Sequence, residues 1–474
     1  MGHLVRASAI ALALKPYANP ILVSMAGGVA EISDYMGIRT EYIPGRDREW
    51  MTRDLWDQYL RDRLVALIEE TDAKLISFDG VVPYPGVIAA KVKSPQTSLV
   101  WVRRGLWQKK PQRYVLGLQS AMMDYIVEPG EIARAYDHGP TSKRKDAQLT
   151  APVSLYQKET ALSRSESRKI LGLDPDRPAV LVQLGTGDSD VNEKMTAALT
   201  GLIGWKDLQV VLTKNPIDKN GKSLVPDGLD LKVVRYFPLA QVLHAFDAGV
   251  CATGYNGAHE LLPAQIPTVF VSNIRGTDDQ EARAQWCHDF GFALRADQAN
   301  LEDIKRTVKK LQDPQVRAAL SEKCKELPEV SGGAEIAQIF LKLIADQAAL
   351  KPGSLTYKRL TLQNHINRGM RHVANIGLRR LALIYRKFRP HHDAEKLALI
   401  YRKFRPHHDA EKMATVAPIF SQASSATELR DLIKSDVRFE HMITGASDTY
   451  KKRRQEIAHT AYNPPLIAIR KREN

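Results

Sequence analysis

Residues 20–350 alternate short apolar runs, rich in β-branched residues, with segments whose apolar residues recur at helical spacing. This alternation predicts an α/β fold of βα units around parallel sheets, because parallel strands need a helical crossover between them. The candidate strands of the first half are residues 21–25, 74–78, 98–102 and 125–127. Ligands bind at the carboxyl ends of such strands, so we look for chemistry in residues 79–86 and 103–107.

A second series of βα units follows a polar stretch, residues 139–152, whose composition is typical of an interdomain connection. Its candidate strands are residues 179–184, 208–212, 231–236, 248–252 and 268–271, and its last helix is expected over residues 334–344. The 474 residues are enough for two globular domains and an appendage. We predict an N-terminal domain over residues 1–140, a linker over 141–152, a C-terminal domain over 153–350 and an extension over 351–474.

The extension differs from the rest of the chain in charge. Residues 351–474 contain 25 Lys and Arg against 11 Asp and Glu, which accounts for the net charge of +14 of the whole chain. Residues 381–396 are repeated without change as residues 397–412, and Pro390 and Pro406 interrupt any helix through the two copies. The basic and aromatic composition favours peripheral contact with an anionic membrane, and a solvated tail without a partner is the alternative. We do not expect nucleic acid as a partner.

The three cysteines, Cys251, Cys287 and Cys324, are widely spaced and form no CxxC pair. Neither a disulfide framework nor a zinc site is therefore predicted. We expect no cofactor. The apolar run over residues 6–14 resembles a short signal peptide but lacks a small-x-small cleavage site, which favours the first helix of a globular domain. No apolar run is long enough to span a bilayer, and the cysteines without a disulfide framework favour a reducing cytoplasm.

The clearest motif begins at Gly254, where Gly254, Tyr255, Asn256 and Gly257 follow an apolar strand and open a helical pattern. Small residues let the backbone approach a ligand closely, and a helix N-terminus offers N–H groups to phosphate. Glu260 falls near the end of the first turn, where a carboxylate can accept hydrogen bonds from a ribose diol. This turn predicts a nucleotide-binding element.

A second strand-to-helix turn carries Asp279, Gln280 and Arg283. Because the two turns close adjacent strands, we expect them to converge on one ligand. Each feature also has a structural interpretation when taken singly: turn glycines, a solvated glutamate, and Asp278 as an N-cap paired with Glu281.

In combination the pattern resembles glycosyltransferase family 28, in which a G-x-x-x-x-x-E turn is followed by a D-Q element. The resemblance covers residues 1–350 in organisation and is strongest over residues 179–283. It implies a GT-B fold, with two Rossmann-like domains facing a cleft. It further implies that Glu260 holds the donor ribose, that Asp279 and Gln280 hold the donor sugar, and that the turn at residues 254–257 holds the diphosphate.

The resemblance also gives roles to a glycine loop and to an aromatic residue. Gly185, Thr186 and Gly187 close the first strand of the C-terminal domain, and a glycine pair there commonly frees N–H groups for an anion. Phe237 sits where the family cups the nucleotide base, and a core aromatic is the alternative. Asn256 and His259 depart from the family's usual residues, so no particular donor sugar or acceptor is carried over.

Residues 2–7 resemble the end of the glycine loop that precedes the first helix in these transferases. The histidine there, His3 in this chain, is a candidate general base that takes the proton of an acceptor hydroxyl. Asp79 lies just beyond a strand and is a second candidate that could also assist the base. The family's first strand has no counterpart in the sequence as given, and we expect the N-terminal domain to be short by that strand.

The resemblance thus implies an inverting, metal-independent glycosyltransferase. It is expected to move a hexosyl or N-acetylhexosaminyl group from a nucleotide-diphosphate sugar, with a UDP-sugar as the expected donor. The acceptor is expected to be a hydroxyl of an envelope glycan or a lipid-linked precursor. Two alternatives stay open: a nucleotide-sugar 2-epimerase, which shares the fold and the donor site, and a nucleotide-sugar-binding protein without catalysis.

Overall fold

The computed structural model divides the chain into two compact units. It describes residues 2–25, 29–46, 51–109, 116, 120–185, 189–213, 225–274, 276–346, 358 and 361–362. The first unit consists of Met1–Ile43, Asp72–Pro83 and Pro95–Lys351, and the second of Pro44–Thr71, Tyr84–Ser94 and Pro352–Asn474. Every site residue predicted from the sequence falls in the first unit.

The C-terminal half of the first unit is built on a six-stranded parallel sheet with the order β12-β11-β10-β7-β8-β9. Its strands are β7 (Ala179–Gln183), β8 (Gln209–Leu212), β9 (Asp230–Val233), β10 (Ala248–Cys251), β11 (Thr268–Val271) and β12 (Leu294–Ala296). The helices of this half are α6 (Arg164–Leu171), α7 (Ser189–Leu202), α8 (Tyr255–Leu261), α9 (Gln280–Asp289), α10 (Leu301–Lys309) and α11 (Pro314–Cys324), with short 3-10 helices η2 (Leu239–Ala245) and η3 (Lys310–Gln312).

The strand order reverses at β7, which pairs with β8 on one side and with β10 on the other. The ends of β7 and β10 are in register, since Gln183 lies opposite Cys251, and the Ala252 N–H donates to the Gln183 carbonyl at 2.9 Å. The loop at Gly185 and the turn at Gly254 therefore leave the sheet side by side. Such a switch point is where doubly wound sheets bind their ligands.

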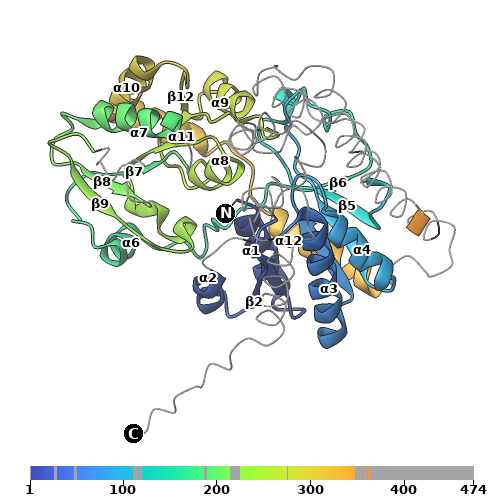
Figure 1. The fold of residues 1–474 in the computed structure, drawn as a ribbon. Helices are drawn as coiled ribbons and strands as arrows, with labels where there is room; N and C mark the ends of the chain where they lie inside the picture. The colour runs from blue at the N-terminus through green and yellow to red at the C-terminus, as the bar shows by residue number, and fades with distance from the viewer. Residues whose placement is uncertain are drawn as a thin grey trace, which may run out of the picture. The chain divides into compact units, whose positions relative to one another are not determined.

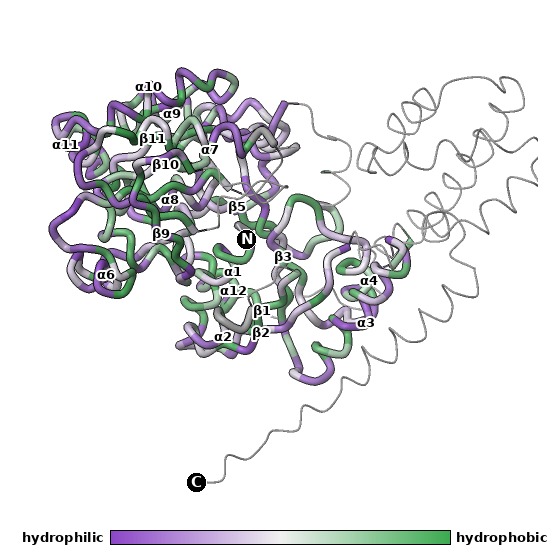
Figure 2. The backbone as a smooth tube through the Cα atoms, turned by 60° about the vertical axis from the view of Figure 1, so that its left-hand side comes forward, coloured by the Kyte–Doolittle hydropathy of each residue, from purple (hydrophilic) through white to green (hydrophobic). Residues whose placement is uncertain are grey.

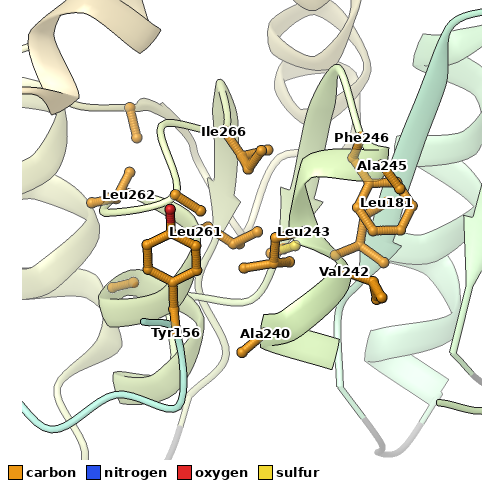
Figure 3. Packing of buried hydrophobic residues seen from close by; sticks show 14 of the residues in the cluster. Tyr156, Leu181, Ala240, Val242, Leu243, Ala245, Phe246, Leu261, Leu262 and Ile266 are labelled. Atoms are coloured by element: carbon orange, nitrogen blue, oxygen red, sulfur yellow. The ribbon is translucent and has the colours of Figure 1, made fainter. Parts of the chain in front are cut away.

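Buried apolar side chains cover both faces of this sheet, which explains why its central strands read as continuous apolar runs. β7 places Leu181 on one face and Val180 and Val182 on the other, each at most 1% exposed. Figure 3 shows the first face, where Leu181 and Phe246 pack with Leu243, Leu262 and Ile266. Burial of this kind contributes about 1.5–3 kcal/mol for each large side chain, before the entropic cost of ordering it.

The N-terminal half of the first unit contains two separate parallel sheets. One is a pair, β1 (Ile21–Ser24) and β2 (Arg39–Tyr42), with α2 (Val29–Met36) between them in the chain. The other has the order β3-β4-β5-β6, with β3 (Leu75–Asp79), β4 (Ser98–Val102), β5 (Tyr125–Glu128) and β6 (Gln148–Leu149), and the 3-10 helix η1 (Arg134–Tyr136) follows β5.

The chain opens with α1 (Gly2–Leu14), as expected for the first helix of a globular domain. It is hydrophobic over most of its length (Figure 2) and packs against β1, β3 and α8. The last described long helix, α12 (Gly332–Ala345), lies beside α1 (Figure 1). Ala9 and Ile10 of α1 share one buried cluster with Ile336 of α12 and with Val100 and Val102 of β4. The helix α12, near the end of the described residues, thus completes the hydrophobic core formed by α1 and β4.

The second unit contains the helices α3 (Arg53–Thr71) and α4 (Pro85–Lys93), which pack on each other. The Trp56 indole is fully buried and donates to the Pro44 carbonyl at 2.7 Å. Gly86 lets the helices approach, because a Cβ there would come within 2.5 Å of the Asp57 carbonyl oxygen. None of the helices in the described part of the chain is long and apolar enough to cross a membrane.

Candidate functional site

His3 and Asp79, which lie far apart in the sequence, meet where α1 begins and β3 ends. His3 Nδ1 lies 2.6 Å from Asp79 Oδ1. The imidazole side chain is 46% exposed, whereas the Asp79 side chain is 7% exposed. The pair therefore joins a buried carboxylate to an imidazole that can reach solvent, and the fold brings together the two residues predicted to act on the acceptor.

The hydrogen bonds around this pair indicate the tautomer of His3. Arg6 Nη2 lies 2.9 Å from His3 Nδ1 and 2.5 Å from Asp79 Oδ1. One ring nitrogen cannot both donate to Asp79 and accept from Arg6. We assign the proton to Nδ1, because it then donates to a carboxylate and Arg6 donates to the same oxygen. Nε2 is left unprotonated, and no described residue forms a hydrogen bond with it.

Asp79 is held in its charged form. Its burial disfavours the carboxylate, but the Arg6 guanidinium and His3 outweigh that effect and lower its pKa below the ordinary value. An ionised carboxylate against Nδ1–H orients an imidazole and stabilises its protonated form. The pair can therefore take a proton at Nε2.

The helix α8 carries two side-chain oxygen atoms without hydrogen-bond partners in the described part of the chain. The Asn256 amide nitrogen donates to the Gly2 carbonyl at 3.0 Å, which ties α8 to the first residue of α1. Asn256 Oδ1 and Glu260 Oε1 are both shielded from solvent, and neither has a hydrogen-bond partner among the described residues. The two residues are four apart on one helix and so share a face. Buried polar atoms without partners are rare in folded proteins, so these two atoms are candidates for contact with a ligand.

Burial raises the pKa of Glu260 to about 8. The unfolded chain ionises this group near pH 4.5, so the folded protein is expected to hold an extra proton between these two values. Its free energy of unfolding should then fall by about 1.4 kcal/mol per pH unit across that window. We expect Glu260→Gln to be more stable than the wild type at pH 8, on the order of a few kcal/mol, and equal to it at pH 4. Urea unfolding of both proteins at pH 4, 6 and 8 measures this.

The control for this prediction is Glu322→Gln, at a side chain that is 73% exposed. Its free energy of unfolding should stay within about 0.5 kcal/mol of the wild type at every pH. A Glu260→Gln difference that does not grow from pH 4 to pH 8 would contradict the raised pKa.

The predicted glycine turns occupy the switch point, although only part of them is described. Gly185 follows β7 with a φ of +90°, and Thr186 and Gly187 lie outside the described residues. Gly254 caps α8 with a φ of −67°, and a Cβ added there would meet nothing within 4 Å. At Gly257 a Cβ would lie 3.2 Å from the Ala252 carbonyl oxygen. Protein contacts therefore do not explain the glycine at position 254.

Tyr255 is a structural anchor of α8. Its hydroxyl donates to the Gly130 carbonyl at 2.8 Å and accepts from the Val153 N–H at 3.0 Å. Its ring lies against the Arg6 guanidinium, 5.0 Å from the ring centroid. The side chain is only 3% exposed, so we expect Tyr255 to hold α8 in place. Its contact with a nucleotide-sugar donor stays a prediction.

The second turn forms a buried ion-pair network that sequence reasoning did not find. Arg283 is fully buried and donates to Glu131 Oε2 at 2.8 Å, to Asp278 Oδ1 at 3.0 Å and to the Thr253 carbonyl at 2.6 Å. Burial disfavours both carboxylates, but Arg283 together with neighbouring charges and hydrogen bonds outweighs it, so the pKa of Glu131 and that of Asp278 are lowered. Arg104 adds a further ion pair with Asp278 at 3.2 Å.

The neighbouring residues of this turn also have internal partners. Asp279 caps α9 by accepting from the Ala282 N–H, so the N-cap is Asp279 and not Asp278. The Gln280 side chain is buried and accepts from the Asn273 N–H at 3.0 Å. The roles of Asp279, Gln280 and Arg283 in holding a donor sugar stay predictions, because their side chains are engaged within the protein here.

Phe237 and His259 both have packing roles. Phe237 is half-buried, packs against the cluster of α1 and α2 that contains Leu4 and Met36, and meets the Tyr35 ring edge-on at 6.2 Å. His259 is fully buried, accepts from the Ile132 N–H and donates to the Tyr255 carbonyl. Burial lowers the pKa of His259, so we expect this imidazole to be neutral. Stacking of Phe237 on a nucleotide base stays a prediction.

No group of three or more potential metal ligands occurs in the described part of the chain. The repeat over residues 381–396 and 397–412, and all basic residues of the extension except Lys358, lie outside the described residues.

No family model matches the chain. Two curated relatives are UDP-N-acetylglucosamine--N-acetylmuramyl-(pentapeptide) pyrophosphoryl-undecaprenol N-acetylglucosamine transferases. The one from Nocardioides sp. is 30% identical over 149 residues, which cover 30% of this chain and only 40% of the relative. The one from Acidothermus cellulolyticus is 25% identical over 272 residues, which cover 53% of this chain and 68% of the relative.

Two solved structures share the fold. The chain aligns with Staphylococcus aureus MnaA, solved with UDP, at a TM-score of 0.53 and 13% identity, over 73% of this chain and 95% of that one. It aligns with the spinosyn forosaminyltransferase SpnP at a TM-score of 0.50 and 16% identity, over 73% and 96%.

The fold is thus the GT-B fold of glycosyltransferases, as predicted. The curated relatives confirm the resemblance to glycosyltransferase family 28, at low sequence identity.

Proposed function

We propose that this protein is a glycosyltransferase that uses a nucleotide-diphosphate sugar. The observation that carries the proposal is the His3–Asp79 pair at the start of α1, together with the unpartnered oxygens of Asn256 and Glu260 on α8, the helix that Asn256 ties to Gly2. The pair supplies a base for a hydroxyl acceptor, and Glu260 supplies an acceptor for ribose hydroxyls at the switch point of the sheet. The names of the relatives and the UDP bound to a protein of the same fold support the donor class.

The proposed reaction is a direct displacement. His3 Nε2 takes the proton of the acceptor hydroxyl as its oxygen bonds to the anomeric carbon. The bond from that carbon to the diphosphate oxygen breaks, and the nucleoside diphosphate leaves with the electron pair. The configuration inverts because attack and departure occur on opposite faces of the sugar, and Asp79 stabilises the imidazolium that forms. Backbone N–H groups at the Gly185 and Gly254 turns would hold the departing diphosphate.

The donor is proposed to be a UDP-sugar and the acceptor a lipid-linked or envelope glycan precursor, the classes that the names of the relatives print. Calorimetric titration with UDP and dTDP tests nucleotide binding, and mass spectrometry of reactions with a UDP-sugar panel and lipid-diphosphate acceptors tests transfer. Binding without transfer or donor hydrolysis would favour a binding protein. Conversion of the UDP-sugar to its 2-epimer would favour the 2-epimerase.

Gly254→Ala is expected to weaken UDP binding without weakening the fold. The backbone at Gly254 suits any residue and a Cβ there has free space in the protein, so the midpoint of thermal unfolding should change by less than about 2 °C. A methyl group between the turn and a diphosphate should raise the Kd for UDP at least about tenfold, which corresponds to about 1.4 kcal/mol. Titration calorimetry and thermal unfolding of the same variant measure both, and an unchanged Kd would contradict diphosphate binding at this turn.

We also propose that residues 351–474 bring the enzyme to an anionic membrane, on the basis of their charge in the sequence. Each Lys or Arg near such a surface contributes about 1 kcal/mol. The full chain should co-sediment with vesicles that contain phosphatidylserine, lose that binding in about 0.5 M salt, and ignore neutral phosphatidylcholine vesicles. Equal recovery with both kinds of vesicle would contradict the proposal, and salt-sensitive binding to RNA alone would indicate a different partner.

A further inference from the structure

Arg6 is a buried cation in the second turn of α1, and only 2% of its side chain is exposed. It lies three residues after His3, so the two side chains share one face of the helix. A charge so deeply buried needs close partners, because removing it from water is costly. Its partner is Asp79, the carboxylate that also meets His3.

The guanidinium holds Asp79 with two of its nitrogens. Nε donates to Oδ2 at 3.0 Å and Nη2 donates to Oδ1 at 2.5 Å. This two-point contact fixes the plane of the carboxylate, which a point charge cannot do. Oδ1 is the same atom that lies 2.6 Å from His3 Nδ1. The direction in which Asp79 faces the imidazole is therefore set by Arg6.

Arg6 is itself fixed from the other side by Tyr255. Its guanidinium lies 5.0 Å from the centroid of that ring, within the range of a cation–π contact. The Tyr255 hydroxyl is tied to the main chain at Gly130 and Val153. The chain of contacts therefore runs from the anchor of α8, through Arg6 and Asp79, to His3.

We propose that Arg6 is a positioning residue for transfer: it orients Asp79 toward His3 and joins this pair to the helix that carries Asn256 and Glu260. The proposal rests on the proposed function and adds to it a residue that acts through Asp79. The charge of Arg6 and its forked shape make separate contributions. Two substitutions separate them, because lysine keeps the charge and glutamine removes it.

The first measurement is kinetic. Arg6→Lys should lower kcat at least tenfold and leave the Kd for UDP within about threefold, because the fork is lost and the donor contacts are not. The matched control is Arg168→Lys, at a buried arginine that also pairs with an aspartate, Asp247. That variant should lose stability and keep the kcat of the folded protein.

The second measurement follows Asp79 directly and does not depend on turnover. The titratable groups around this carboxylate are His3 and Arg6 from α1 and Arg104 from the loop after β4. Arg6 is the strongest influence that opposes burial in lowering the pKa of Asp79. In Arg6→Gln the ¹³Cγ resonance of Asp79, assigned by its loss in Asp79→Asn, should titrate at higher pH than in the wild type. Arg168→Lys should leave that titration where it is.

The outcomes separate this inference from the proposed function. A wild-type protein that transfers no sugar to any acceptor would overturn both. If the wild-type enzyme transfers sugar and Arg6→Lys has the same kcat as Arg168→Lys, the positioning role alone would be overturned. An Asp79 titration that does not move in Arg6→Gln would also overturn it.

Discussion

His3→Ala is expected to lower the rate of sugar transfer by a factor of about 10² to 10⁴, the range that general-base catalysis commonly provides. The imidazole is half-exposed and meets the rest of the protein chiefly through Asp79 and Arg6. Its removal should therefore take away the proton acceptor and leave the fold and the donor contacts in place. The Kd for UDP should stay within about threefold, since Asn256 and Glu260 are unchanged. Steady-state transfer rates and titration calorimetry measure the two effects.

The matched control is His288→Ala, at an exposed histidine in the last turn of α9. Its transfer rate should equal that of the wild type. If His3→Ala kept more than about a third of the wild-type rate, His3 would not be the base. Loss of transfer in His3→Ala together with loss of UDP binding would instead point to a damaged site.

Arg283→Met is expected to lower the free energy of unfolding by about 3–5 kcal/mol, because it removes one partner of a buried ion-pair network. Glu131 and Asp278 would keep their burial and lose the cation that holds their pKa values down. The contacts also link the loop after β5 to the turn before α9. Urea unfolding at pH 7, followed by tryptophan fluorescence, measures the change.

The comparison for this variant is Arg306→Ala, which breaks an ion pair whose arginine is 74% exposed. Its free energy of unfolding should fall by less than about 1 kcal/mol. An equal loss of unfolding free energy in the two variants would show that the Arg283 network stabilises the protein no more than an exposed ion pair does. The triple change of Arg283, Glu131 and Asp278 to apolar residues should recover part of the loss, as replacement of whole buried ion pairs often does.

The strands that could be predicted from the sequence were those with continuous apolar runs. β4 and β11 begin and end at the predicted residues, and β7, β8 and β10 differ from prediction by one residue at an end. β2 was not predicted, because Arg39–Tyr42 has the sequence RTEY and none of its side chains is buried in the core. β6 and β12 are too short to show an alternation of apolar and polar residues. They form strands because they pair in parallel with β5 and β11.

The sequence predicted the residues of the site better than the contacts between them. His3 and Asp79 were each proposed on local patterns, and their direct contact depends on how α1 lies over the end of β3. Arg6 gave no signal, because an arginine in an apolar helix reads as a solvated residue. Glu131 follows an ordinary turn, and only the fold brings it to Arg283, more than one hundred residues away. Long-range charge pairs have no local spacing that would reveal them.

The packing of α12 on α1 and β4 has a consequence for how this protein forms during synthesis. The sheet of β3–β6 has left the ribosome long before Ile336 and Phe340, which cover the same face as Ile10. At 5–20 residues per second, the roughly 200 residues between them take about 10–40 s to be made. For that time the nascent N-terminal half is expected to expose an apolar sheet face to chaperones, because α12, which completes this core, has not yet been made.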